Sequence, residues 1–282
     1  MDVDELLRWG AEVRRDLPWR RTRDPWSILV SELMLQQTQV VRVIPKYEAF
    51  LDAFPTAVDC AAGSVADVVR LWAGLGYNRR ALNLHRCAVQ IADEHGGVVP
   101  DSLPELLALA GVGPYTARAV LAFAFEADVA VVDTNVARVL ARQSAAPLKA
   151  AEVQALADQV APAGEGWAWN QSMLDLGAMI CTKRNPTCRA CPALATCGWQ
   201  GEGADPAVGS AGVSGKQSTF AGSDRQGRGR LVDRLRAESV AEEDLAAVMG
   251  WPGDHERATR VAAGLIADGL AVREAGVLRL PS

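Results

Sequence analysis

Four cysteines within a stretch of 17 residues constrain the fold of this 282-residue chain more than any other feature. Cys181, Cys188, Cys191 and Cys197 are separated by six, two and five residues. Because the N-terminal sequence lacks the basic region of a secretion signal, a disulfide framework is disfavoured and a metal centre is expected. Four thiolates at this spacing suit either a tetrahedral zinc ion or a [4Fe–4S] cluster. In both cases the segment 181–197 must fold around the metal.

The composition, with 49% hydrophobic and 22% charged residues, is typical of a globular protein and argues against a disordered or fibrous chain. No apolar run is long enough to cross a bilayer, so we expect a cytoplasmic protein without a membrane partner. The formal net charge of −5 argues, at first sight, against nucleic acid as the partner. Arginines nevertheless gather in local groups, so the distribution of charge matters more than its sum.

Hydrophobic spacing divides the chain into three parts. Apolar residues three and four positions apart predict helices throughout residues 1–200, and strand alternation is scarce, so we predict an all-α domain there. Residues 201–226 include six glycines and almost no large apolar side chain, which predicts a flexible linker. Residues 227–282 predict a small winged-helix-like module that ends in a hairpin around Ala275 and Gly276. Its helices are expected near 228–238, 241–249 and 255–270.

Glu32 is an acidic residue on an apolar helix face. A helix that follows Asp24 and Pro25 would place Ile28 and Leu35 one turn on either side of Glu32. Burial there would raise the pKa of the carboxyl and keep it protonated near neutral pH, as a general acid requires. The alternative is a buried structural glutamate that pairs with an arginine. The candidate partners are Arg20, Arg21 and Arg23.

Asp133 is predicted to lie in the opposite environment. It follows the apolar run 129–132 and precedes a helical segment, so it is placed as an N-cap. Backbone N–H donors and the helix dipole would lower its pKa and keep it ionised. Asp133 could simply be a cap. Together with Glu32, however, it forms an acid and an anion, the pair needed for cleavage through an oxocarbenium-like transition state.

Gly111-Val112-Gly113 separates two predicted helices. Such a hairpin exposes backbone N–H groups at a helix N-terminus, which can bind an anion. A dinucleotide-binding fold is disfavoured, because a helix precedes the glycines and Thr116 occupies the position of the third glycine. An ordinary turn between two helices remains the alternative.

Together these segments resemble a known family, the helix-hairpin-helix DNA glycosylases with an iron–sulfur loop, and most closely their adenine glycosylase (MutY) branch. The resemblance covers about residues 5–200 and rests on five motifs that occur in order. These are 31–40, 75–77, 111–117, 132–136 and the cysteine segment 181–197.

The resemblance implies a helix-hairpin-helix fold and a monomeric base excision repair enzyme associated with the bacterial nucleoid. Its partner would be double-stranded DNA in which adenine is mispaired with 8-oxoguanine or guanine. The adenine would be flipped into a pocket and its N-glycosidic bond hydrolysed. The four cysteines would hold [4Fe–4S] rather than zinc.

The resemblance also assigns roles to individual residues. Glu32 would protonate adenine N7 and Asp133 would stabilise the oxocarbenium ion, while Tyr115 and Asn135 would support these two carboxyls. The adenine pocket would be lined by Trp19, Arg20, Leu35, Val40 and Gln171. Residues that probe the stack beside 8-oxoguanine would be Gln37, Thr38, Leu75 and Tyr77. The hairpin Gly111, Val112 and Gly113 would bind a backbone phosphate.

Tyr115 stands where strand-nicking relatives carry a lysine. A tyrosine cannot form an imine with the sugar, so we expect base removal without efficient strand cleavage. The sequence also departs from the family at Asn78, where many relatives have a second tyrosine.

No Nudix-like C-terminal domain is recognisable in the sequence. Our hypothesis is that Phe220 and Ser223 approach 8-oxoguanine and that the terminal module docks on DNA, whereas a passive tether to a partner-binding module is the alternative. For the whole chain, the competing functions are a thymine or uracil mismatch glycosylase and a non-catalytic iron–sulfur DNA sensor.

Overall fold

The computed structural model describes residues 1–212 and 219–282. Contacts between Cα atoms divide the chain into two compact units. Unit 1 comprises residues 1–28, 101–103 and the described part of 113–216, and unit 2 comprises 29–100, 104–112 and the described part of 217–282. Helices dominate both units, so the all-α prediction for the first 200 residues is confirmed. None of the helices in the described part of the chain is long and apolar enough to span a membrane.

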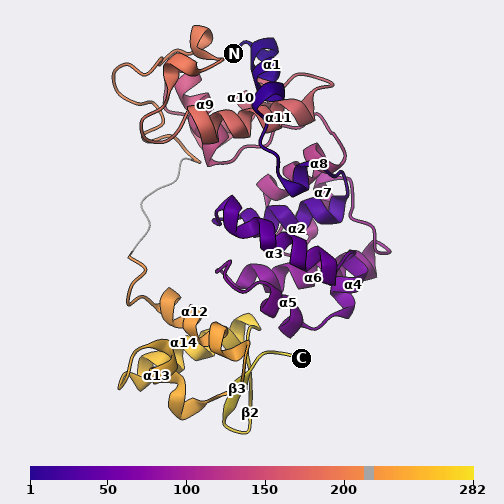
Figure 1. The fold of residues 1–282 in the computed structure, drawn as a ribbon, viewed down its shortest axis with the longest axis vertical. Helices are drawn as coiled ribbons and strands as arrows, with labels where there is room; N and C mark the ends of the chain where they lie inside the picture. Colours follow the sequence, from indigo (N-terminus) through magenta and orange to yellow (C-terminus); the bar gives the residue numbers. More distant parts are fainter. Residues whose placement is uncertain (213–218) are drawn as a thin grey trace. The chain divides into compact units, whose positions relative to one another are not determined.

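Helices α1 and α9 both pack against α11 in unit 1 (Figure 1). Aliphatic and aromatic side chains of these three helices form the core of the unit. Leu6, Leu140 and Trp169 are fully or almost fully buried in it. α1 approaches α11 closely, because a Cβ at Gly10 would lie 1.9 Å from Ser172 Oγ. The helices of unit 1 are α1 (Val3–Val13), η1 (Pro18–Arg20), α8 (Pro114–Ala124), α9 (Thr134–Gln143), α10 (Ala150–Val160), α11 (Gly166–Asp175), the π-helical turn η2 (Leu176–Ile180), η3 (Cys188–Ala190) and η4 (Leu194–Thr196).

Unit 2 packs its helices around the long helix α6. Leu84 and Ile91 of α6 are fully buried, together with Phe50 and Trp72. Thr56 and Asp59 form a reciprocal capping box, which fixes where α4 begins. Most of unit 2's first part consists of α2 (Pro25–Leu35, which starts in unit 1), α3 (Val40–Ala53), α4 (Ala57–Ala62), α5 (Val65–Leu71), α6 (Arg79–Glu94) and α7 (Leu103–Ala108).

The C-terminal module also belongs to unit 2 and has the order helix, strand, short 3-10 helix, two helices, and two strands. The predicted hairpin is present, with Glu274 opposite Val277 and a turn at Ala275 and Gly276. A third strand of two residues, β1, pairs antiparallel with β3 and gives the strand order β1-β3-β2. The elements are α12 (Asp224–Leu235), β1 (Val240–Ala241), η5 (Glu242–Asp244), α13 (Leu245–Met249), α14 (His255–Asp268), β2 (Val272–Glu274) and β3 (Val277–Arg279).

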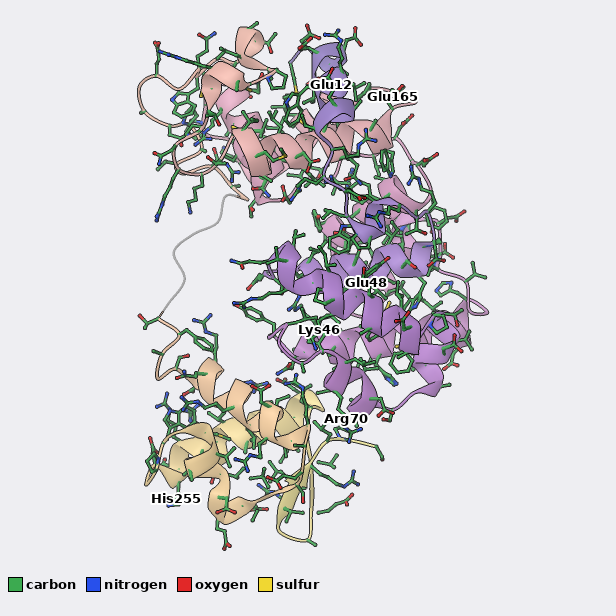
Figure 2. The ribbon with its side chains drawn as sticks, viewed as in Figure 1. Glu12, Lys46, Glu48, Arg70, Glu165 and His255 are labelled. Atoms are coloured by element: carbon green, nitrogen blue, oxygen red, sulfur yellow. The ribbon has the colours of Figure 1, made fainter. Side chains whose placement is uncertain are left out.

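Hydrogen bonds attach this module to α5 and α6. Arg236 donates from Nε to Val69 O at 2.9 Å and from Nη2 to Asn78 Oδ1 at 2.8 Å. Arg70, labelled in Figure 2, places Nε 3.4 Å from Arg236 O. Asp268 pairs with Arg79 of α6 at 3.0 Å. Asn78, which departs from the family pattern, thus contacts the C-terminal module.

At both of its described ends, the segment 201–226 is more ordered than the predicted flexible linker. Ser210 Oγ accepts a hydrogen bond from Leu148 N at 3.0 Å, and Ala211 N donates to Leu148 O at 2.8 Å. At the other end, α12 begins at Asp224 with Ser223 as its N-cap. The glycine content concealed these contacts, because they depend on single polar groups rather than on apolar periodicity. Residues 213–218 of this segment lie outside the described residues.

Candidate active site

Asp133 is the N-cap of α9, as predicted. Its Oδ1 accepts hydrogen bonds from the backbone N–H groups of Asn135 and Val136, both at 2.7 Å. Its Oδ2 accepts a third bond from Asn135 Nδ2 at 2.8 Å. These three donors fix the orientation of the carboxylate at the start of the helix.

The predicted direction of the Asp133 pKa shift is wrong. Burial raises the pKa of Asp133 above its ordinary range, and the donors from Val136 and Asn135 and the charge of Arg138 offset only part of this effect. The sequence indicated the cap correctly, because a cap is local. It could not indicate how much of the carboxyl is removed from water, which depends on the tertiary fold.

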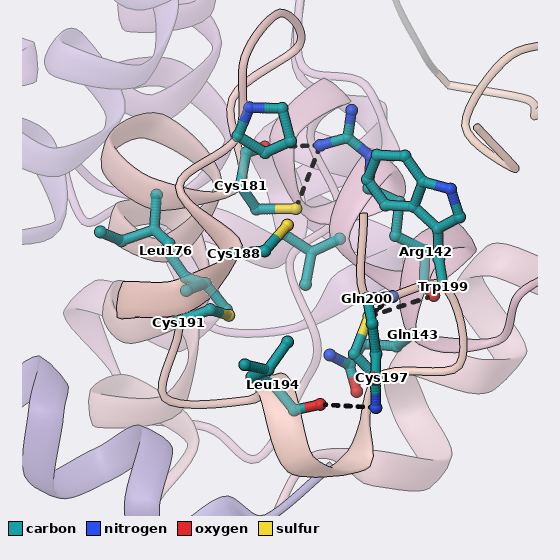
Figure 3. A pocket seen from close by; sticks show the side chains of 13 residues that line it. Arg142, Gln143, Leu176, Cys181, Cys188, Cys191, Leu194, Cys197, Trp199 and Gln200 are labelled. Atoms are coloured by element: carbon teal, nitrogen blue, oxygen red, sulfur yellow. Dashed lines mark hydrogen bonds between the residues drawn. The ribbon is translucent and has the colours of Figure 1, made fainter. Parts of the chain in front are cut away.

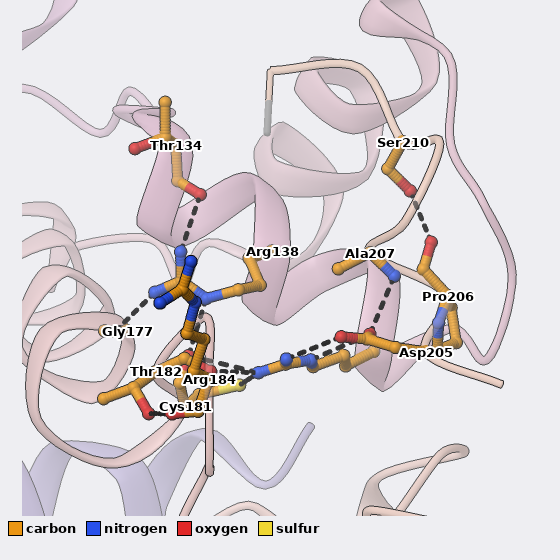
Figure 4. Close-up of polar contacts among 11 residues, drawn as sticks. Thr134, Arg138, Gly177, Cys181, Thr182, Arg184, Asp205, Pro206, Ala207 and Ser210 are labelled. Carbon is orange, nitrogen blue, oxygen red and sulfur yellow. Dashed lines mark hydrogen bonds and ion pairs between the residues drawn. The ribbon is translucent and has the colours of Figure 1, made fainter. Parts of the chain in front are cut away.

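Asn135 and Arg138 connect Asp133 to the cysteine segment. Arg138 Nη2 donates to Asn135 Oδ1 at 2.8 Å, and its Nε donates to Cys181 O at 2.7 Å. A further bond of 2.6 Å joins Arg138 Nη2 to Gly177 O. Figure 4 shows the Arg138 guanidinium between α9 and this segment. The side-chain amide of Asn135 therefore cannot turn without breaking a bond to Asp133 or to Arg138.

Trp19, Arg20 and Gln171, predicted to line a base pocket, are all buried residues of unit 1. Arg20 forms a two-pronged ion pair with Asp175, with Nη1–Oδ2 and Nη2–Oδ1 distances of 2.7 and 3.0 Å. Burial raises the pKa of Asp175, but Arg20 and Arg15 outweigh this and hold it below the ordinary range. Asp175 was missed in the sequence, because it is 155 residues away from Arg20 along the chain.

Glu32 lies in unit 2 on α2 and is 4% exposed, so its predicted burial on an apolar helix is confirmed. Its neighbours Leu29 and Leu33 are buried as well. The three arginines considered as its alternative partners form ion pairs with other carboxylates. These pairs are Arg20–Asp175, Arg21–Asp16 and Arg23–Glu126.

The buried guanidinium of Arg80 holds together the loops that carry Gln37, Thr38, Leu75 and Tyr77. It donates to Leu33 O and Met34 O of α2 at 2.8 and 2.9 Å. It also donates to Thr38 Oγ1 and to the carbonyls of Leu75 and Gly76, at 3.0, 3.2 and 3.1 Å. Nothing in the sequence indicated this role, because the carbonyls of Leu33 and Met34 lie 47 and 46 residues away along the chain.

These bonds stabilise two strained turns. Gln37 and Tyr77 have φ values of +55° and +47°, which side chains other than glycine rarely adopt. Burial lowers the pKa of Arg80 to about 10, which still leaves the side chain charged at neutral pH. A charged donor bonded to several carbonyls can hold such turns, because every lost bond would leave a polar group buried without a partner.

The hairpin 111–113 joins α7 to α8 as predicted. Gly111 has a φ of +79°, and a Cβ there would lie 2.7 Å from Asn83 Cβ, so only glycine fits. Gly113 precedes Pro114, the first residue of α8, and leaves the helix N-terminus without a side-chain cap. Tyr115 follows in the first turn of α8.

All four clustered cysteines line a single pocket in unit 1 (Figure 3). Apolar side chains complete the lining, among them Val139, Leu176 and Leu194. Gly201 has a φ of +89°, and a Cβ there would lie 3.0 Å from Cys188 Sγ. Within 1–212 and 219–282, no group of three or more His, Cys, Asp or Glu side chains has the arrangement needed to hold a metal ion. The four cysteines that the sequence singled out are thus brought together around one pocket.

Comparison with known proteins agrees with this architecture. The model of the HhH-GPD superfamily of base excision DNA repair proteins matches residues 30–163. The chain is 42% identical over 276 residues to the adenine DNA glycosylase of Mycolicibacterium smegmatis. The aligned region covers 96% of this chain and 92% of that protein. The chain belongs to the HhH-GPD superfamily. The resemblance inferred from the five motifs is therefore confirmed.

Other members of the superfamily match the chain in part. The human adenine DNA glycosylase is 40% identical over 209 residues, which cover 68% of this chain and 38% of the human protein. A thermostable thymine-DNA glycosylase superposes with a TM-score of 0.66 and 30% identity, over 71% of this chain and 94% of that one. Endonuclease III in a trapped covalent complex with DNA gives a TM-score of 0.63 and 25% identity, over 71% and 93%.

We predict that Arg80→Lys lowers the free energy of unfolding by about 2 kcal/mol, because an ammonium group cannot reach all five acceptors. Urea denaturation followed by circular dichroism measures the change. The matched control is Arg79→Lys at the neighbouring position, whose side chain is 68% exposed. An exposed ion pair contributes little. Equal effects of the two substitutions would show that Arg80 does not hold the loops.

Proposed function

We propose that this protein is a DNA glycosylase that hydrolyses the N-glycosidic bond of adenine mispaired with 8-oxoguanine or guanine. The observation that carries the proposal is the match to adenine DNA glycosylases at 42% identity over nearly the whole chain. Two carboxyls on the matching segments support it, since Glu32 is buried on an apolar helix and Asp133 is held by three hydrogen bonds.

The two carboxyls have complementary tasks in the proposed reaction. Glu32 donates a proton to adenine N7, so that the base leaves as a neutral group. Positive charge then develops on the sugar, and the carboxylate of Asp133 stabilises it electrostatically. Burial of Asp133 disfavours its ionised form in the free protein, so the cationic sugar is the partner that compensates for this cost. Asn135 keeps Oδ2 of Asp133 oriented throughout.

Tyr115 favours base removal over strand cleavage. An amine nucleophile on the protein is needed to form an imine with the sugar, and the phenol of tyrosine cannot provide one. The endonuclease III match is a trapped covalent complex with DNA. In the present chain, we propose that water completes the reaction and that the product is an abasic site.

The same proposal assigns a [4Fe–4S] cluster to the pocket of four cysteines. Thiolates are the ligands that such clusters use. Cys181, Cys188, Cys191 and Cys197 would hold it, and the cluster would fix the segment 181–197 in its folded form. No step of base removal passes through it.

A groove in unit 2 is the proposed site for the base opposite adenine. The groove has a volume of about 850 Å³, and Gln37, Thr38 and Tyr77 are among the residues that line it. Phe220 and Arg225, at the start of the C-terminal module, line it as well. Aromatic and arginine side chains can stack on a base and bind its phosphate.

Of the two residues expected to read 8-oxoguanine, Phe220 is the better candidate. Its side chain is 57% exposed. Ser223 instead uses its hydroxyl locally, because Oγ donates to Phe220 O at 2.6 Å and accepts from Gln226 N at 3.4 Å. We therefore propose that Ser223 positions α12 and that Phe220 contacts the DNA.

A second candidate function, thymine removal, is favoured by one observation. The thermostable thymine-DNA glycosylase matches the fold at 30% identity. Glu32 argues for adenine, because a proton donor for N7 assists only a purine leaving group.

We predict that Glu32→Gln lowers the single-turnover rate of adenine release at least about 100-fold, because an amide cannot supply the proton. Duplexes with adenine opposite 8-oxoguanine, adenine opposite guanine, and thymine opposite guanine are compared. The wild-type protein should release base from the first two only, and borohydride should trap no covalent complex.

The matched control is Glu48→Gln, because Glu48 is an exposed residue of α3 (Figure 2) and should leave the rate unchanged. Full activity of Glu32→Gln would exclude the acid role, and release of thymine by the wild-type protein would favour the second candidate function.

We predict that Phe220→Ala reduces the preference for adenine opposite 8-oxoguanine over adenine opposite guanine at least about 5-fold, since stacking on one base contributes about 1–3 kcal/mol. The ratio of single-turnover rates on the two duplexes measures it. Phe125→Ala is the control, because Phe125 is also exposed but lies in unit 1. An unchanged ratio would mean that Phe220 does not read the opposite base.

A further inference from the structure

Arg142 of α9 is a buried cation beside the cysteine pocket. Its side chain is 2% exposed, and Arg138 on the same helix is buried as well. The guanidinium donates from Nη1 to Thr182 O at 2.8 Å and to Cys181 O at 3.3 Å. The same nitrogen lies 3.3 Å from Cys181 Sγ, within the range of an N–H···S hydrogen bond (Figure 3).

The backbone of Arg142 contacts the last cysteine of the segment. Arg142 O accepts a bond from Cys197 Sγ at 3.4 Å and another from Trp199 N at 3.1 Å. The Trp199 ring lies over the guanidinium, 4.6 Å from Arg142 Cζ to the ring centroid. One residue of α9 thus bonds to the first and the fourth cysteine, the two ends of the segment that would surround a cluster.

Asp205 determines where this guanidinium points. Its two carboxylate oxygens accept from Arg142 Nε at 3.0 Å and from Nη2 at 2.7 Å, a two-pronged pair that fixes the guanidinium plane. Asp205 belongs to the segment 205–211, which we call the strap. The strap is attached at its other end through the bonds of Ser210 and Ala211 to Leu148.

The carboxylate of Asp205 stabilises the buried guanidinium of Arg142. A buried guanidinium is costly unless it is paired and its N–H groups are bonded. With Asp205 on one edge, the remaining N–H groups are directed at Cys181 and Thr182. Without it, the guanidinium would gain more by turning toward water than by keeping a weak bond to sulfur.

We propose that Asp205 is a positioning residue for the iron–sulfur centre, and that the strap holds Arg142 against the first cysteine ligand. The inference rests on the cluster assigned under Proposed function. Hydrogen bonds to ligand sulfurs and residues that orient them stabilise such centres and set their potentials. The strap lies in the segment that composition predicts to be a linker, so its role is read from the contacts alone.

The test uses the full-length protein with its cluster bound. Excess iron chelator is added, and loss of the visible thiolate-to-iron absorbance is followed in time. We expect Asp205→Asn to shorten the half-life of the cluster about 10-fold, as removal of an outer partner does at other metal sites. Asp158→Asn is the matched control, because Asp158 pairs with Arg118 in the same unit and does not line the cysteine pocket.

Two further variants separate positioning from general damage. Arg142→Lys should shorten the half-life to a similar extent, and combining it with Asp205→Asn should add nothing, since both act through one contact. Ser210→Ala loosens the strap without changing any charge and should give a smaller effect in the same direction. Circular dichroism establishes that each variant is folded.

An unchanged half-life in Asp205→Asn would overturn the proposal, as would an equal loss in Asp158→Asn or fully additive effects of Asp205→Asn and Arg142→Lys. Purification of the wild-type protein without iron would also overturn it, because the proposal assumes a cluster bound to the four cysteines. Adenine release is measured separately on the same samples. If the wild-type protein fails to release adenine while Asp205→Asn still shortens the half-life of the cluster, the proposed function is contradicted and this inference stands.

Discussion

Buried guanidinium groups that donate to backbone carbonyls hold the irregular parts of both units in place. Loops cannot satisfy their own carbonyl groups as helices do, and a buried carbonyl without a donor is costly. Arg80 supplies the donors for the turns at 37–38 and 75–77, and Arg138 and Arg142 supply them for the segment that begins at Cys181. The proposed site residues are attached to these turns and to the helix ends beside them. Their positions therefore depend on three arginines rather than on helix packing alone.

This use of arginine changes what the net charge of −5 means. Several arginines that contribute to this sum are buried, among them Arg20, Arg80 and Arg138. Under the proposed function, affinity for DNA would come from fewer exposed cations, backbone amides at the hairpin and stacking side chains in the groove. A duplex bound mainly through a few phosphates dissociates as salt rises, because counterions compete for them. A negative net charge is therefore compatible with a nucleic-acid partner, because binding depends on where the charges lie.

The sequence predicted what is local and missed what is distant. The cap at Asp133, the apolar helix segment that carries Glu32 and the glycine hairpin depend on residues within a few positions, and all three are confirmed. The partners of Arg80 and Arg142 lie up to 47 and 63 residues away, so no periodicity could indicate them. The predicted direction of the Asp133 pKa shift was wrong for the same reason, because the removal of a carboxyl from water depends on distant parts of the fold. Strand β1 has only two residues, too few to show alternation.

The central claim is that Asp133 acts as an anion in a buried setting, oriented by Asn135. The measurement that tests it most directly is the pH dependence of single-turnover adenine release in the wild-type protein and in Asn135→Ala. Protonation removes the anion, so the rate should fall as the pH drops through the raised pKa of Asp133. The hydrogen bond from the Asn135 side chain lowers the pKa of Asp133. Its loss in Asn135→Ala should therefore raise that pKa and move the acidic limb to higher pH. An acidic limb that stays in place or moves to lower pH would contradict the account.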